Sequence, residues 1–166
     1  MGELAQAAGT SAGKLTHHFP TKTALYEAVF EEFMKQFRAG PLARLGDVST
    51  PPKQRIQGFF QGMLELYSMQ QRDPIGCPVG HAAEDADGVT DSMHKVAYEL
   101  LRETEALFAR AFRDLGLLQA EAHRNAMLCV SAWQGAVVVA RAGGGIDHIQ
   151  NVFRALQAES AVISLA

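Results

Sequence analysis

The chain has 166 residues, of which 48% are hydrophobic and 20% charged, and its 15 lysines and arginines against 18 aspartates and glutamates give a formal net charge of -3. This length corresponds to one domain of ordinary size, or to a small module joined to a larger one. The near-neutral balance excludes a polycation that coats nucleic acid or anionic lipid by bulk charge, so any such contact has to be local.

The cysteine content and the hydropathy indicate the cellular compartment of the protein. Cys77 and Cys129 lie far apart and match no paired metal-ligand spacing, and no signal-peptide pattern opens the chain. We therefore expect a reducing, cytoplasmic environment. The longest apolar stretch, from Ala126 to Ala140, is interrupted by Ser131 and Gln134 and is shorter than the roughly 20 residues of a membrane span. The sequence predicts no transmembrane helix.

The first predicted elements are two short helices. One runs from Glu3 to Ala8, Gly9 supplies the positive φ of a tight turn, and Ser11 is the N-cap of a second helix that reaches about His17. Two short helices joined by such a turn have helix-turn-helix geometry.

A third, longer helix is predicted from Thr21 to Ala39, with Lys22 in its first turn. A cation at that end opposes the helix dipole, which favours a role for Lys22 in binding a phosphate. The stretch from Gly40 to Pro52, rich in proline and glycine, is predicted as a loop. We therefore divide the chain into a module of residues 1–40 and a domain of residues 41–166.

The second domain is predicted to consist of helices alone, so the fold class is all-α. Apolar residues recur at steps of three and four, and glycine or proline clusters separate the periodic segments. The last helix begins near Asp147, whose spacing to Gln150 resembles a capping box. The predicted helices run from about Pro51 to Arg72, from Thr90 to Gly116, from Gln119 to Ala142 and from Ile146 to Ile163, and the breakers are Asp73 to Gly80 and Gly143 to Gly145.

The helix from Gln119 to Ala142 is apolar nearly all round in its second half, where Ser131, Gln134 and Arg141 are the strongly polar residues. A helix of this kind must be covered on more than one face. The simplest cover is a second subunit, packed through this helix and the Ile146 to Ile163 helix in a four-helix arrangement. A central helix inside a monomer is the alternative.

The N-terminal residues resemble a known family. The segment from Glu3 to Val29 reads ELAQAAGTSAGKLTHHFPTKTALYEAV. It resembles the DNA-binding signature of the TetR family, in which an Ala-x-x-Ala-Gly helix and turn precede a recognition helix that ends in His-Phe. The resemblance implies operator DNA as a partner, with base or phosphate contacts from Ser11, Lys14 and His17, a phosphate anchor at Lys22, and close approach of the helix to the duplex at Gly13.

The segment also departs from the family pattern. The family usually has a tyrosine that touches the DNA backbone where this chain has Thr16, so one contact is shortened or lost. Ala12 stands where a polar or basic residue is common. The family carries a further helix before this segment, and without one the apolar faces of Leu4 and Leu15 would be exposed. We therefore expect the sequence to be a fragment of a longer protein; an incomplete module is the alternative.

A second resemblance concerns the C-terminal half. Gly76 to Asp85 reads GCPVGHAAED and Gly135 to Gly144 reads GAVVVARAGG, and both resemble the TetR subgroup that includes lincomycin-resistance-type repressors. The resemblance implies a small lipophilic or aromatic inducer bound between helices, although core packing requires the same residue types. The candidate lining residues are Phe60, Met63, Leu64, Tyr67, Met93, Tyr98, Met127, Trp133 and Gln134.

Enzymatic chemistry has a weaker basis in the sequence. His81, Glu84 and His94 could share a divalent metal, but a solvated acidic turn is the preferred interpretation. Cys77 is disfavoured as a nucleophile because Pro78 follows it and no orienting acid is evident. We predict neither a metal nor a cofactor, and no enzyme.

The sequence thus predicts a homodimeric, ligand-responsive regulator that binds operator DNA and is released by a small lipophilic or aromatic molecule. Repression is what the family resemblance implies. Two alternatives remain open: a ligand-binding helical dimer that has lost DNA binding, and a small helical metal-dependent enzyme.

Overall fold

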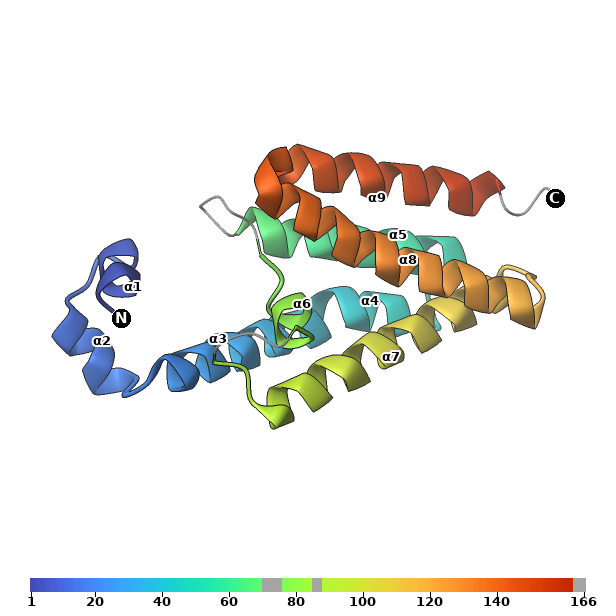
Figure 1. Cartoon of the computed structure of the whole chain (residues 1–166). Helices are drawn as coiled ribbons and strands as arrows, with labels where there is room; N and C mark the ends of the chain where they lie inside the picture. The colour runs from blue at the N-terminus through green and yellow to red at the C-terminus, as the bar shows by residue number, and fades with distance from the viewer. Residues whose placement is uncertain (70–75, 85–87, 163–166) are drawn as a thin grey trace.

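The computed structural model describes residues 1–69, 76–84 and 88–162, except the side chains of 159–162, and these residues form helices with no strand among them (Figure 1). The all-α prediction is therefore confirmed. The predicted ends of three elements, at Arg72, Asp73 and Ile163, lie outside the described residues.

The N-terminal helices follow the predicted caps. Helix α1 spans Gly2–Ala7 and α2 spans Ala12–His18. Gly9 turns the chain between them with φ of 65°, and the hydroxyl of Ser11 accepts a hydrogen bond from the backbone N–H of Lys14 at 3.2 Å. These contacts satisfy donors that the helix leaves open at its first turn, so the predicted helix-turn-helix is present.

Helix α3 spans Lys22–Phe37, and Thr21 caps it by accepting from the N–H of Ala24 at 3.0 Å. The loop predicted from Gly40 is wrong in its first half, because the chain stays helical through a π-turn, η1 (Arg38–Leu42), and α4 (Ala43–Gly46). Proline lacks the N–H that a regular helix needs, and the wider π-turn at Pro41 accommodates the missing bond.

The remaining helices form the body of the molecule. They are α5 (Pro52–Ser68), α6 (Pro78–Ala82), α7 (Asp91–Asp114), α8 (Gln119–Val139), the π-turn η2 (Ala140–Gly144) and α9 (Gly145–Val162). Helices α7 and α9 both pack against α8, and α5 contacts α7 and α9 from the other side. The loop predicted from Asp73 to Gly80 is thus wrong at its end, where Pro78 opens α6 at a position that needs no N–H.

Aromatic side chains fill the centre of this body. Phe37 from α3 stacks on Trp133 from α8 with ring centroids 5.5 Å apart. Phe59 from α5 meets both Trp133, at 5.6 Å, and Phe108 from α7, at 4.8 Å. All four rings are fully buried, so α3 belongs to the same hydrophobic core as the helices that follow it.

The ends of α7 and α8 follow the predicted signals. The hydroxyl of Thr90 accepts from the N–H of Met93, and Gly116 ends α7 with φ of 99°. Gly143 and Gly145 also have positive φ, of 124° and 61°, and they turn the chain directly into α9. The predicted capping box is therefore wrong, because Asp147 lies inside the first turn of α9 rather than before it.

By length and composition alone, residues 119–158 are apolar enough to cross a membrane. In the structure this stretch is two helices, α8 and α9, that fold back on one another at the glycine turn (Figure 1). Their inner faces bury Trp133, Ile149 and Phe153 in the core. The hydropathy of this stretch thus reflects a packed helix pair.

Candidate functional site

Two features of the structure can carry function: the exposed face of α2 and a cavity beside α3. In Figure 1, α1 and α2 lie at the free end of α3, away from α8 and α9. The cavity lies further along α3, where that helix meets α6 and the end of α5.

The residues of α2, and Ser11 at its N-cap, that the TetR resemblance assigned to DNA contact are all exposed. The side chains or backbone of Ser11, Gly13, Lys14, Thr16 and His17 are exposed, whereas Leu15 and Phe19 are half-buried. A Cβ added at Gly13 would meet no atom within 4 Å, so packing within the described chain does not require glycine there. The surface is therefore open to a large partner.

Lys22 is exposed at the start of α3, next to the cap formed by Thr21. The uncapped backbone N–H groups of this first turn point away from the helix in the direction that favours an anion. Of the two apolar residues expected to be uncovered in this module, Leu4 is 42% exposed and Leu15 is half-buried.

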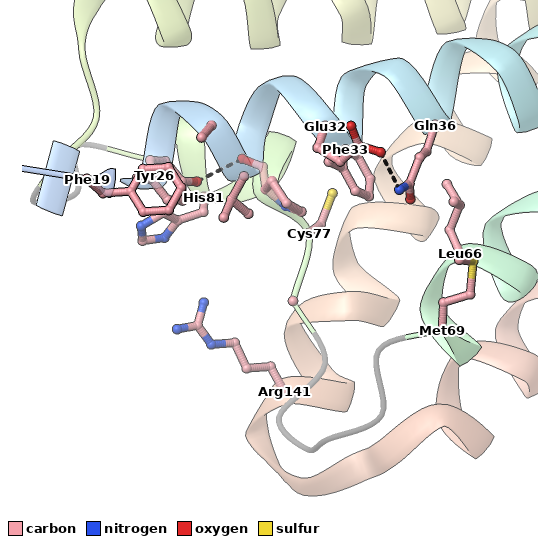
Figure 2. Close-up of a pocket in the computed structure, with 14 residues that line it drawn as sticks. Phe19, Tyr26, Glu32, Phe33, Gln36, Leu66, Met69, Cys77, His81 and Arg141 are labelled. Atoms are coloured by element: carbon pink, nitrogen blue, oxygen red, sulfur yellow. Dashed lines mark hydrogen bonds between the residues drawn. The ribbon is translucent and has the colours of Figure 1, made fainter. Parts of the chain in front are cut away.

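The cavity has a volume of about 770 Å³ and lies between α3, the end of α5, the start of α6 and η2 (Figure 2). Its wall is mostly apolar, with a few polar side chains at its ends. The lining residues are Phe19, Tyr26, Ala28, Val29, Glu32, Phe33, Gln36, Leu66, Met69, Gly76, Cys77, Pro78, His81 and Arg141. This size and composition suit a small organic molecule.

Tyr26 joins α3 to α6 at one end of the cavity. Its hydroxyl donates a hydrogen bond to the carbonyl oxygen of Pro78 at 3.0 Å, and its ring meets the ring of His81 edge-on at 4.9 Å. Burial raises the pKa of Tyr26 to about 12, with a further rise from Cys77, while Arg141 acts in the opposite direction. The phenol therefore stays protonated and keeps its hydrogen bond across the neutral range.

A polar cluster lies directly behind the cavity wall. Cys77 is buried, which raises the pKa of its thiol, and its Sγ accepts a hydrogen bond from Nε2 of Gln134 at 3.9 Å. Trp133 donates to the hydroxyl of Tyr67 at 2.7 Å. A Cβ at Gly80 would come within 2.6 Å of Oε1 of Gln134, so this glycine allows α6 to approach α8.

The structure places the predicted ligand residues in several different environments. Phe60, Met63, Tyr67 and Trp133 are fully buried in the core, and Leu64 packs against it. Met93 lines a second cavity of about 360 Å³ between α3 and α7, whereas Tyr98 and Met127 are 61% and 48% exposed. Within the described part of the chain, none of the predicted set lines the larger cavity. Gln134 donates a hydrogen bond to Cys77, which does line it.

The cavity residues of α3, among them Val29, Glu32 and Gln36, were not predicted from the sequence. They lie beside the buried stripe of Phe30, Phe33 and Phe37. The helical periodicity of apolar residues does not show which positions beside such a stripe are packed against another helix and which line a cavity. One signal was available: Arg141 is a lone cation at the end of an apolar helix.

The residues considered for a metal are not brought together. His81 packs on Tyr26 at the cavity, whereas His94 is exposed on α7. Among residues 1–69, 76–84 and 88–162, no group of three histidine, cysteine or acidic side chains could hold a metal ion.

Comparison with known proteins identifies the family. Residues 52–155 match the family described as "Transcriptional regulator LmrA/YxaF-like, C-terminal domain", and residues 1–29 match "Bacterial regulatory proteins, tetR family". These two matches cover the body of the molecule and the α1–α2 module respectively.

Individual relatives agree with these matches. The HTH-type transcriptional repressor DhaR of Mycobacterium sp. (strain GP1) is 21% identical over 141 residues, which cover 82% of this chain and 69% of DhaR. The HTH-type transcriptional regulator LmrA of Bacillus subtilis (strain 168) is 22% identical over 141 residues, covering 84% of this chain and 73% of LmrA. A crystal structure of a TetR transcriptional regulator from Legionella pneumophila superposes with a TM-score of 0.70 at 20% identity, covering 95% of this chain and 83% of that one.

The structural likeness establishes the fold, and the family matches over both parts of the chain establish its class. Transcriptional regulators of this class are not enzymes. The chain therefore belongs to the TetR family of transcriptional regulators.

Proposed function

We propose that the protein is a homodimer that binds operator DNA through α2 and the start of α3, and that a small molecule in the cavity beside α3 releases it. The observation that carries the proposal is the exposed face of α2, which holds Ser11, Gly13, Lys14, Thr16 and His17 together. In this arrangement α2 enters the major groove, and Lys22 with the N–H groups of α3 holds a backbone phosphate. Binding operator DNA implies a cytoplasmic location.

An uncovered apolar face on α8 supports the homodimer. Met127, Leu128, Val138 and Val139 are 48%, 61%, 60% and 46% exposed. Positions 128, 131, 135, 138 and 142 are separated by steps of three and four, so they share one face of the helix. A Cβ at Gly135 would meet nothing within 4 Å, which leaves room for a partner helix to approach. We assign this face, with α9, to the contact with a second copy.

The position of Phe19 supports coupling between ligand and DNA. Phe19 ends α2 and also lines the cavity, so a molecule in the cavity touches the residue that joins the recognition helix to α3. The long continuous helix from Lys22 to Gly46 then links the module to the body. A ligand that binds better when α2 is displaced lowers the affinity of the protein for DNA. By linkage, DNA lowers the affinity for the ligand by the same factor.

The test is fluorescence polarisation with a labelled duplex from the promoter of the protein's own gene, against a scrambled duplex of the same composition. The double variant Lys14→Ala/Lys22→Ala should weaken specific binding at least about ten-fold and flatten its dependence on salt, because each subunit of the dimer loses two phosphate-neutralising charges. The matched control is Lys53→Ala/Lys95→Ala, which removes two exposed lysines of α5 and α7 and should leave binding unchanged.

Binding that survives the Lys14/Lys22 variant with its salt dependence intact contradicts the assigned DNA surface. An absence of preference for the promoter duplex at low salt, by a protein that is folded and dimeric, favours a ligand-binding dimer without DNA binding.

A further inference from the structure

We infer that the ligand of the cavity beside α3 is an amphiphilic organic anion, with an aromatic or lipophilic body and one acidic group that pairs with Arg141. The inference rests on the proposed function, in which this cavity is the ligand site. It adds the charge of the ligand and the residue that recognises it, and neither follows from the family match.

Arg141 carries the inference because no described residue forms an ion pair with it. The residue belongs to η2 and lines the cavity, and Figure 2 shows its side chain reaching toward the side where Tyr26 and His81 lie. No carboxylate lies within 4.0 Å of its guanidinium among the described residues, although Arg38, Arg44 and Arg55 each pair with one. An unpaired guanidinium at the edge of an apolar cavity offers a planar fork that matches a carboxylate, sulfonate or phosphate.

An interaction of Arg141 with the helix dipole does not explain why its side chain lines the cavity. Cations near the C-terminus of a helix are favoured by its dipole, and Arg141 lies in η2, directly after α8. That effect operates equally well when the side chain extends into bulk solvent. In this structure the side chain, although exposed, also lines the cavity, on the side where Tyr26 and His81 lie.

The acidic side chain of the cavity argues against a cationic ligand. Glu32 accepts a hydrogen bond from Nε2 of Gln36 at 2.8 Å and lies 3.9 Å from the ammonium group of Lys35. Its charge is thus already shared by two neighbours and by solvent, since the side chain is 57% exposed. Of the charged side chains that line the cavity, Glu32 pairs with a described residue and Arg141 does not.

The rest of the wall suits the body of such a ligand. Phe19, Phe33 and Pro78 offer flat or rigid apolar surfaces, and Leu66 and Met69 close the end formed by α5. Aromatic and methionine side chains adapt to fused rings and alkyl chains alike. A volume of about 770 Å³ holds two or three rings together with an acidic group.

Two fluorescent probes with the same rings test the inference. The anion 1-anilinonaphthalene-8-sulfonate differs from neutral N-phenyl-1-naphthylamine by one sulfonate, and both brighten in apolar surroundings. We expect Arg141→Met to weaken binding of the sulfonate about ten-fold and to change binding of the neutral probe less than two-fold. Arg141→Lys keeps the charge and should retain most of the affinity for the sulfonate.

Two further variants act as controls. Arg110→Met removes an exposed arginine of α7 that does not line the cavity and should affect neither probe. Val29→Trp fills the cavity from a position that is 48% exposed, so the core is undisturbed, and it should abolish binding of both probes. Circular dichroism confirms that each variant is folded.

The outcomes separate the inference from the function on which it rests. If Val29→Trp removes both probes but Arg141→Met leaves the affinity for the sulfonate unchanged, the anionic class is wrong and the cavity remains a ligand site. If neither probe responds to Val29→Trp, the cavity is not the ligand site, and both the inference and that part of the proposed function are overturned.

Discussion

The phenol of Tyr26 donates a hydrogen bond to the carbonyl oxygen of Pro78, and this contact ties α3 to α6 at the mouth of the larger cavity. Tyr26 lies on the first turns of α3, close to the module that we propose binds DNA, and Pro78 opens α6. Tyr26, Pro78 and His81 all line the cavity, so this hydrogen bond lies at the surface that a bound molecule would meet.

We therefore expect Tyr26→Phe to favour the ligand-bound state. The change removes one hydrogen bond, which contributes about 1 kcal/mol, and leaves the ring on His81. Ligand binding, followed with 1-anilinonaphthalene-8-sulfonate, should tighten up to about five-fold, and less probe should be needed to release the promoter duplex. Tyr98→Phe, which alters a phenol 61% exposed on α7, is the matched control. Equal behaviour of the two variants would show that the Tyr26 hydroxyl plays no part in coupling.

A second prediction concerns the buried arginine of α5. Arg55 has only 2% of its side chain exposed, and its Nη2 pairs with the carboxylate of Asp114 at the end of α7. Its Nε and Nη1 have no hydrogen-bond partner in the described part of the chain. Asp114→Ala should therefore lower the free energy of unfolding by about 3 kcal/mol, because it leaves a buried charge unpaired.

Urea denaturation of the unchanged protein, Asp114→Ala, Arg55→Leu and the double variant measures this effect. The double variant Arg55→Leu/Asp114→Ala should recover most of the stability that Asp114→Ala loses, since the charge is removed together with its partner. If the two single changes simply add in the double variant, the pair is not coupled and the prediction is wrong.

Much of the fold was predictable because local signals decide where helices begin and end. Ser11, Thr21 and Thr90 each accept from a backbone N–H three residues ahead, as the sequence suggests. The continuation through Pro41 was not predictable, because proline ordinarily ends a helix and the π-turn that tolerates it depends on tertiary packing. The division between residues 1–40 and 41–166 remains a prediction, although α3 shares the core of the second part.

The two candidate sites differed in how far the sequence could locate them. The face of α2 follows from a short motif whose residues lie within two turns of helix, so their common exposure could be foreseen. The cavity depends on how far α3, α6 and η2 diverge, and helical periodicity carries no information on that distance. The predicted ligand residues were chosen from apolar stripes, and the largest of them, Phe60, Tyr67 and Trp133, fill the core instead.

The packing that follows the π-turn can be tested at Gly62. A Cβ at this position of α5 would come within 3.1 Å of the backbone Cα of Pro41, and a backbone atom cannot move aside as a flexible side chain can. We expect Gly62→Ala to lower the free energy of unfolding by about 1 to 3 kcal/mol, despite the higher helix propensity of alanine. Gly58→Ala, on the same helix, meets the side chain of Arg44 at 3.3 Å and should cost less. A more stable Gly62→Ala protein would show that α5 and η1 are not in close contact.

The last prediction joins the proposed dimer to DNA binding. Val138 is 60% exposed on the apolar face of α8, and Val138→Glu would place a charge where a second copy would bury it. We expect this variant to sediment as a monomer at micromolar concentration and to bind the promoter duplex at least about ten-fold more weakly, because two recognition helices held together gain effective concentration at paired half-sites. Val48→Glu makes the same change at a residue that is also 60% exposed but lies after α4, and it should remain dimeric. A Val138→Glu protein that dimerises and binds DNA normally would place the subunit contact elsewhere and remove the support that α8 gives to the proposal.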